Sequence, residues 1–232
     1  MKALIYKEFK LAMHPICYVF IALFPFMIVI PSTTYPITVG FIYVLSCYPI
    51  LFLGANKGQQ SNDLLYSTLL PVRKKDIVLA RIITVIIMHV AFSLLTSALC
   101  PVGMMIRNSI PEANPGEPSL FDVGFSLNSY VLVLAIVLVG YALADLIFFP
   151  IYYKNGKSIV MSTLMMILGF IVYLGIFTVA LPLILEEVGI TGVDSLPLYI
   201  QFIALAVALL IYAGLHFIVY DVSAKNLEKV DF

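Results

Sequence analysis

The chain has 232 residues, of which 62% are apolar and 11% charged, against about 25% charged residues in an ordinary soluble domain. This composition excludes a soluble domain and indicates a membrane protein. Lys and Arg balance Asp and Glu at a net charge of zero, which taken alone suggests no polyanion partner such as nucleic acid, although the charges are distributed unevenly along the chain. We therefore predict an all-α polytopic membrane protein.

The N-terminal segment, residues 1–14, is too charged to span a bilayer. Its apolar residues, such as Leu4, Ile5 and Phe9, recur at helical spacing, whereas Lys7 and Lys10 fall on another face. This pattern is typical of an amphipathic helix that lies at the membrane interface.

Long apolar stretches predict six transmembrane helices. The region from Ile16 to Ala55 has no charged side chain, and as one helix it would be about 60 Å long, twice a hydrocarbon core of about 30 Å. It must therefore turn, and the two prolines at Pro31 and Pro36 interrupt helical bonding at the turn. The predicted spans are residues 16–33, 36–55, 82–106, 123–153, 158–185 and 195–220.

The basic residues predict which side of the membrane each loop faces. Apart from Arg107, every Lys and Arg lies in the N-terminal segment, in residues 56–81, in the turn from Lys154 to Lys157, or in the C-terminal tail. Six spans place these regions on one side, and the positive-inside rule makes that side cytoplasmic. We expect both termini in the cytoplasm.

A polar and basic segment, residues 56–81, separates the second and third spans; we call it the basic segment. Ser61 or Asn62 can cap a short helix here, and Pro71 would end it. A basic turn and the start of the third span would follow. Lipid anchoring explains the charges, but a capped helix with exposed leucines indicates docking in a protein groove. The predicted coupling residues are Asp63, Leu64, Leu65, Tyr66, Leu69, Pro71, Arg73, Lys74, Lys75 and Asp76.

Three ionisable residues, His89, Asp145 and His216, fall inside predicted spans. Each lies about 12 to 14 Å from a basic residue at the cytoplasmic end of its helix, so they can share one depth. Interhelical hydrogen bonding, a role in substrate passage or gating, and a metal site remain open. Two His and one Asp on separate helices form a weak metal pattern, so we assign no metal ligands from the sequence. We hypothesise that Asp145 pairs with one histidine.

Several catalytic sequence motifs are absent. The chain contains no GxxxxGK[ST] phosphate-binding loop, no HExxH and no GxSxG. We therefore expect no enzymatic activity and no cofactor on this chain.

Residues 61–81, together with the order of an interfacial helix, six spans and cytoplasmic termini, resemble a permease subunit of a type-2 bacterial ABC exporter. The resemblance is to small permeases that export toxin peptides such as phenol-soluble modulins, or that confer bacteriocin immunity. It implies a bacterial plasma-membrane protein, a second permease copy as homodimer or heterodimer, and separate ABC ATPase subunits that bind ATP and Mg. The basic segment would be the coupling helix, and the substrate an amphipathic or hydrophobic compound. No large extracellular domain is present, unlike in larger members.

Two alternatives belong to other functional classes. One is a membrane immunity or anchor protein without transport activity. The other is an ion-coupled secondary transporter, which would use the carboxylate of Asp145, although the sequence shows no inverted repeat.

Overall fold

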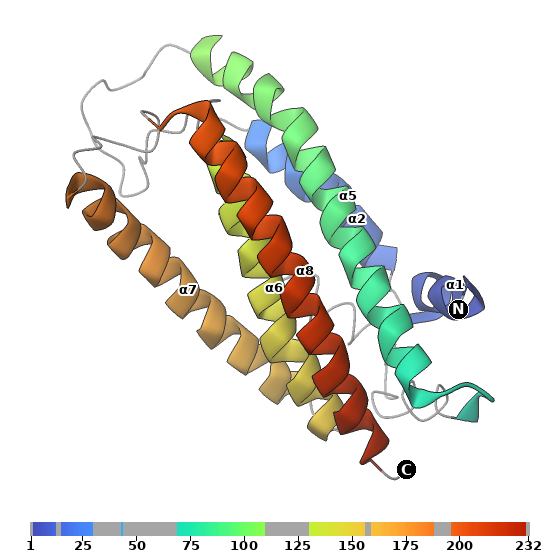
Figure 1. The fold of residues 1–232 in the computed structure, drawn as a ribbon. Helices are drawn as coiled ribbons and strands as arrows, with labels where there is room; N and C mark the ends of the chain where they lie inside the picture. Colours follow the sequence, from blue (N-terminus) through green and yellow to red (C-terminus); the bar gives the residue numbers. More distant parts are fainter. Residues whose placement is uncertain are drawn as a thin grey trace.

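The computed structural model describes residues 2–12, 15–29, 43, 69–109, 130–155, 159–187 and 196–230, and the regular structure in these ranges is helical. Four long helices form a bundle (Figure 1). They are α5 (Lys74–Ser109), α6 (Tyr130–Asn155), α7 (Ile159–Glu187) and α8 (Leu198–Glu228). Shorter elements precede them: α1 (Lys2–Lys7), a π-helical turn (Glu8–Ala12), α2 (Pro15–Leu23) and a 3-10 helix (Phe24–Val29).

Helix α6 lies between α7 and α8, and α5 packs against α8 and α2 (Figure 1). Both ends of the chain lie at the same end of the bundle, where α1 contacts α5 (Figure 1). The side chain of Lys74, at the start of α5, donates to the carbonyl of Val230, 2.8 Å away, after the end of α8. The two polar ends of these helices are therefore joined directly.

Three of the helices are long and apolar enough to cross a membrane: Lys74–Val102, Tyr130–Lys154 and Leu198–Glu228. A shorter apolar helical stretch is Ile159–Tyr173, within α7. The protein is therefore embedded in the membrane. The predicted span 82–106 falls within α5, and spans 158–185 and 195–220 overlap α7 and α8 but start before these helices do. The end of span 16–33, most of span 36–55 and the start of span 123–153 lie outside the described residues.

The helices extend further than the predicted spans at the end where the termini lie. Helix α5 begins at Lys74, so Lys74 and Lys75 belong to its first turn and not to a separate basic turn. Helix α8 continues to Glu228 through most of the predicted polar tail. Charged side chains mark where the apolar sequence ends, but they do not interrupt the backbone hydrogen bonds of a helix. The charged ends of α5 and α8 also contact each other, since Lys75 pairs with Glu228 at 3.5 Å. The predicted N-terminal helix, residues 1–14, corresponds to α1 followed by the π-helical turn Glu8–Ala12, and residues 1, 13 and 14 lie outside the described residues.

The core is built around α6. Its residues Tyr141, Phe148, Phe149 and Tyr153 are fully buried. On α7, Gly169 lies so close to α6 that an added Cβ would be 2.2 Å from Cδ1 of Ile147. Small residues allow this close approach between membrane helices. The outer sides of α7 and α8 instead expose large apolar side chains, as expected of surfaces that contact lipid or another apolar partner. Examples are Leu168, Val172, Leu210 and Phe217.

Candidate functional site

The three intramembrane ionisable residues meet in the bundle interior. Nε2 of His216, on α8, lies 2.7 Å from Oδ2 of Asp145, on α6. Nδ1 of His89, on α5, lies 3.8 Å from the same oxygen. His89 and Asp145 are fully buried, and His216 is nearly so. The predicted pairing of Asp145 with a histidine is confirmed, and the shared depth brings all three helices to one point.

The hydrogen bonds of His216 limit its protonation state. Nδ1 lies 2.8 Å from the backbone carbonyl of Tyr212, and a carbonyl oxygen only accepts, so Nδ1 carries a hydrogen and donates it. Nε2 therefore faces Asp145 either with a hydrogen to donate or with a free lone pair. A hydrogen must lie between the two atoms, carried either by Nε2 or by the carboxyl of Asp145, because two lone pairs at 2.7 Å repel each other.

Aromatic side chains enclose His89. Its ring stacks on Tyr141, with 4.6 Å between centroids, and contacts the edge of Tyr43 at 5.9 Å. Tyr43 in turn stacks on Phe92 at 4.1 Å. The hydroxyl of Tyr212 lies 3.0 Å from Nδ1 of His89. These rings keep the cluster in an apolar environment, where charged hydrogen bonds are stronger than in water.

The donor atoms of His89, Asp145 and His216 all lie within 4.8 Å of one another, so these residues could hold a metal ion. Imidazole nitrogen and carboxylate oxygen are ligands of zinc and related ions. The sequence identified these three residues but not Tyr212. The backbone carbonyl of Tyr212 contacts His216, and its hydroxyl contacts His89. Its position one helical turn before His216 is the signal that could have indicated it.

A second buried ion pair was not predicted. Arg81 on α5 pairs with Glu8 at 2.7 Å, and both side chains are at most 4% exposed. Arg81 also approaches the hydroxyl of Tyr152, on α6, at 3.5 Å, and Lys7 lies 3.7 Å from Glu8. The charge of Arg81 thus joins the N-terminal segment to α5 and α6. No local sequence pattern connects positions 8 and 81, since the contact depends on the tertiary fold.

The coupling residues Asp63, Leu64, Leu65 and Tyr66 lie outside the described residues. Leu69 is 71% exposed, and Pro71 and Arg73 are exposed as well. Arg73 forms two hydrogen bonds to Asp76, of 3.1 and 3.2 Å, and these bonds and the carboxylate charge raise the pKa of Arg73. Lys74 and Lys75 contact the end of α8 in their own chain.

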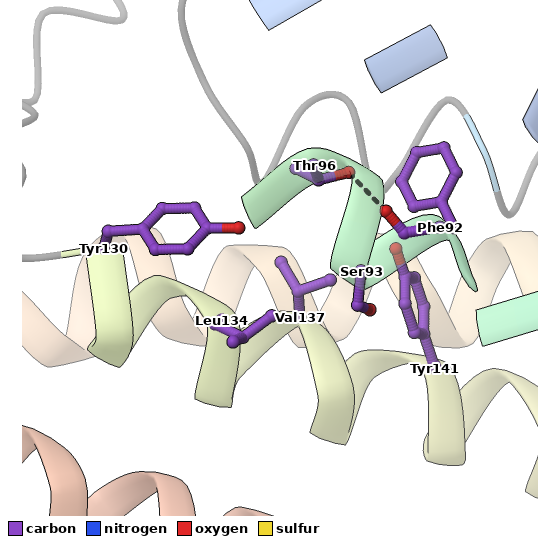
Figure 2. Close-up of a pocket in the computed structure, with 7 residues that line it drawn as sticks. All are labelled: Phe92, Ser93, Thr96, Tyr130, Leu134, Val137 and Tyr141. Atoms are coloured by element: carbon purple, nitrogen blue, oxygen red, sulfur yellow. Dashed lines mark hydrogen bonds between the residues drawn. The ribbon is translucent and has the colours of Figure 1, made fainter. Parts of the chain in front are cut away.

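A cavity of about 10 Å³ lies between α5 and α6, and one of its lining residues is Tyr141, whose ring stacks on His89. Figure 2 shows Ser93, Thr96 and Phe92 of α5 facing Tyr130, Leu134, Val137 and Tyr141 of α6. The Thr96 hydroxyl donates to the Phe92 carbonyl at 2.7 Å (Figure 2), and Ser97 bonds to Tyr130. The buried Ser93 hydroxyl has no hydrogen-bond partner among the described residues. The space is about that of one water molecule.

Comparison with known proteins identifies the family. Residues 3–223 match the sequence profile of the family described as ABC-2 family transporter protein. Comparisons with curated proteins and with solved structures returned no match. The match covers nearly the whole chain, and the apolar helices agree with it. Members of this family act with an ABC ATPase. Because the match covers residues 3–223, the chain belongs to the ABC-2 transporter family, as a membrane-embedded permease subunit of an ABC transporter.

Proposed function

We propose that this subunit moves amphipathic or hydrophobic peptides, or similar compounds, out of a bacterial cell, driven by separate ABC ATPase subunits. The basic segment would be the coupling helix that enters a groove in the ATPase. The ATPase would hold ATP and Mg, because this chain has no phosphate-binding loop. Two permease copies, identical or related, would complete the transporter.

The observation that carries the proposal is how the start of α5 is attached to the rest of the bundle. Leu69 and Arg73 are exposed immediately before this helix. From the first turn of α5 onward, Lys74 contacts Val230 and Lys75 contacts Glu228, both at the end of α8. Two turns further on, Arg81 is paired with Glu8. A force on the exposed segment therefore reaches α5, α8 and the N-terminal segment together.

This arrangement suits transport by rearrangement of whole helices. Closure of an ATPase dimer would displace the basic segment and, through α5, change the packing of α5 against α8. We place His89, Asp145 and His216 in gating, because they join α5, α6 and α8 at the point where such a change would separate them. An apolar path between two permease copies would suit an amphipathic substrate better than an ion.

Co-purification tests the coupling proposal. We expect the double variant Leu65→Asp and Leu69→Asp to insert normally into the membrane but to lose the co-purifying ABC ATPase, because charged side chains cannot enter an apolar groove. The matched control is Leu120→Asp with Phe121→Asp, in a loop predicted to face the opposite side. Wild type and control should retain the ATPase and its ATP hydrolysis. Equal ATPase recovery with the coupling variant would contradict docking through the basic segment.

The buried Asp145 and His216 pair gives some support to a second candidate, an ion-coupled carrier. Such a carrier would transport substrate in the absence of any ATPase, in response to an ion gradient alone. The ATP-driven proposal predicts no transport under those conditions.

A further inference from the structure

We propose that His89, Asp145 and His216 bind one divalent transition-metal ion of the zinc type, which ties α5, α6 and α8 together inside the membrane. Nδ1 of His89, Oδ2 of Asp145 and Nε2 of His216 converge within 4.8 Å. Two imidazole nitrogens and one carboxylate oxygen form a ligand set found in zinc sites that keep one position open. Magnesium and calcium prefer six or more oxygen ligands and do not fit this set.

The orientation of His216 makes it a suitable ligand. Its Nδ1–H donates to the carbonyl of Tyr212, at 2.8 Å, which leaves Nε2 as the nitrogen that points at Asp145. Metal-binding histidines commonly donate their other ring N–H to a carbonyl in this way, because the bond fixes both the tautomer and the ring plane.

A metal ion would contact all three side chains, whereas a proton joins two of them. A proton between Nε2 of His216 and Oδ2 of Asp145 explains their separation of 2.7 Å. Nδ1 of His89 lies 3.8 Å from the same oxygen, beyond hydrogen-bond distance, and its hydrogen bond with the Tyr212 hydroxyl, at 3.0 Å, orients the ring toward this point. An ion at the centre would take the place of that proton and contact all three donors. The Tyr212 hydroxyl, 3.0 Å from Nδ1 of His89, lies close enough to offer a fourth oxygen.

The three donor atoms, which lie within 4.8 Å of one another, would have to draw together around a zinc ion. Zinc lies about 2.0 to 2.1 Å from nitrogen or oxygen ligands, so tetrahedral donors are separated by about 3.3 Å. The observed separations of 2.7 and 3.8 Å lie on either side of this value. The aromatic rings of Tyr43 and Tyr141 beside His89 keep the site dry, which strengthens the bonds between the ion and its ligands.

The metal ion would act at the contact between α5, α6 and α8 that we place in gating. Within the proposed transport function, an ion shared by three helices would oppose the separation of α8 from α5 and α6, so its occupancy would regulate opening. The binding of the ion itself does not depend on that function, and it can be measured without an ATPase or a substrate.

The test measures zinc on the purified full-length chain. The protein, carrying an affinity tag without histidine, is incubated with zinc sulfate in mild detergent and separated from free zinc by gel filtration. Zinc is then quantified by mass spectrometry. We expect about one zinc per chain in the wild type and at least about a tenfold loss in Asp145→Asn and in His216→Gln, because each removes a ligand. The control His14→Gln removes the chain's remaining histidine and should retain the zinc.

Cobalt provides a second measurement that needs no variant. Cobalt(II) in place of zinc should give the intense visible absorption of a four-coordinate site. The proposal is overturned if the wild type retains no zinc, if the variants retain as much zinc as the wild type, or if cobalt shows only weak six-coordinate absorption. A negative result would leave the permease function untouched, since loss of ATPase docking is measured separately.

Discussion

Two buried ion pairs join residues that are more than 70 positions apart in the sequence. Asp145 contacts His216 between α6 and α8, and Glu8 contacts Arg81 between the N-terminal segment and α5. Removing one partner of a buried pair leaves the other without compensation, which costs more than losing an exposed pair. These residues are therefore the single positions at which we expect the largest effects.

Replacement of Asp145 should lower stability and impair transport. Asp145→Asn removes the charge that accepts the bond from His216, and we expect a loss of about 2 kcal/mol. The measurement is the thermal unfolding midpoint in detergent. Asp221→Asn is the matched control, because Asp221 pairs with Lys225 on the exposed side of α8 and should change stability by less than about 0.5 kcal/mol. If Asp145→Asn altered neither stability nor transport, both the packing role and the gating role would be wrong.

The contact between Glu8 and Arg81 should be equally sensitive. We expect Arg81→Gln to destabilise the protein by about 3 kcal/mol, since Glu8 would remain charged and buried. The double variant with Glu8→Gln should be less destabilised than Arg81→Gln alone, because both charges are removed. Arg73→Gln serves as the control, since Arg73 is 82% exposed in its pair with Asp76. Thermal unfolding of the wild type, the single variants Arg81→Gln and Glu8→Gln, and the double variant measures the coupling, and strictly additive effects would contradict it.

At the scale of helices, hydropathy predicted much of the fold, and long-range pairing could not be predicted. Uncharged stretches located α5, α7 and α8, because a membrane span must satisfy its backbone hydrogen bonds within the helix. The distance of His89, Asp145 and His216 from their basic ends predicted a shared depth, and the structure brings the three together. Rotation about each helix axis decides which faces meet, however, so Tyr212 and the partner of Arg81 became visible only in the fold.

Packing between α6 and α7 depends on small residues. A Cβ added at Gly140 would lie 3.1 Å from the ring of Tyr173 and 3.2 Å from that of Phe170. We expect Gly140→Leu to separate the two helices and to cost about 1 to 3 kcal/mol. Gly214→Leu, on α8, is the control, because no atom lies within 4 Å of its added Cβ. Equal thermal unfolding midpoints for the two variants would show that α6 and α7 do not pack as described.

At the scale of the whole molecule, the described helices have a buried apolar core and an apolar exterior. Helix α6 fills the centre, while α7 and α8 direct large apolar side chains outward. Members of the ABC-2 transporter family act with an ABC ATPase, and our proposal assigns the energy supply to that subunit. The exposed segment before α5 would connect that subunit to the bundle. Helix α5, which follows this segment, contacts Val230 after α8 through Lys74 and Glu8 in the N-terminal segment through Arg81.

The complete transporter should contain two permease chains and two ATPase chains. Native mass spectrometry of the complex, purified in mild detergent, should give this composition. A complex with one permease chain would contradict the proposed pairing of permease copies.

The most direct test of the ATP-driven export proposal is transport by the purified complex in proteoliposomes. A fluorescently labelled amphipathic peptide is supplied on the side that carries the ATPase, and its movement across the bilayer is followed. We predict movement that requires ATP and Mg, and that is lost in the Leu65→Asp, Leu69→Asp double variant. Peptide movement driven by an ion gradient without ATP, or no movement in the presence of ATP hydrolysis, would contradict the proposal.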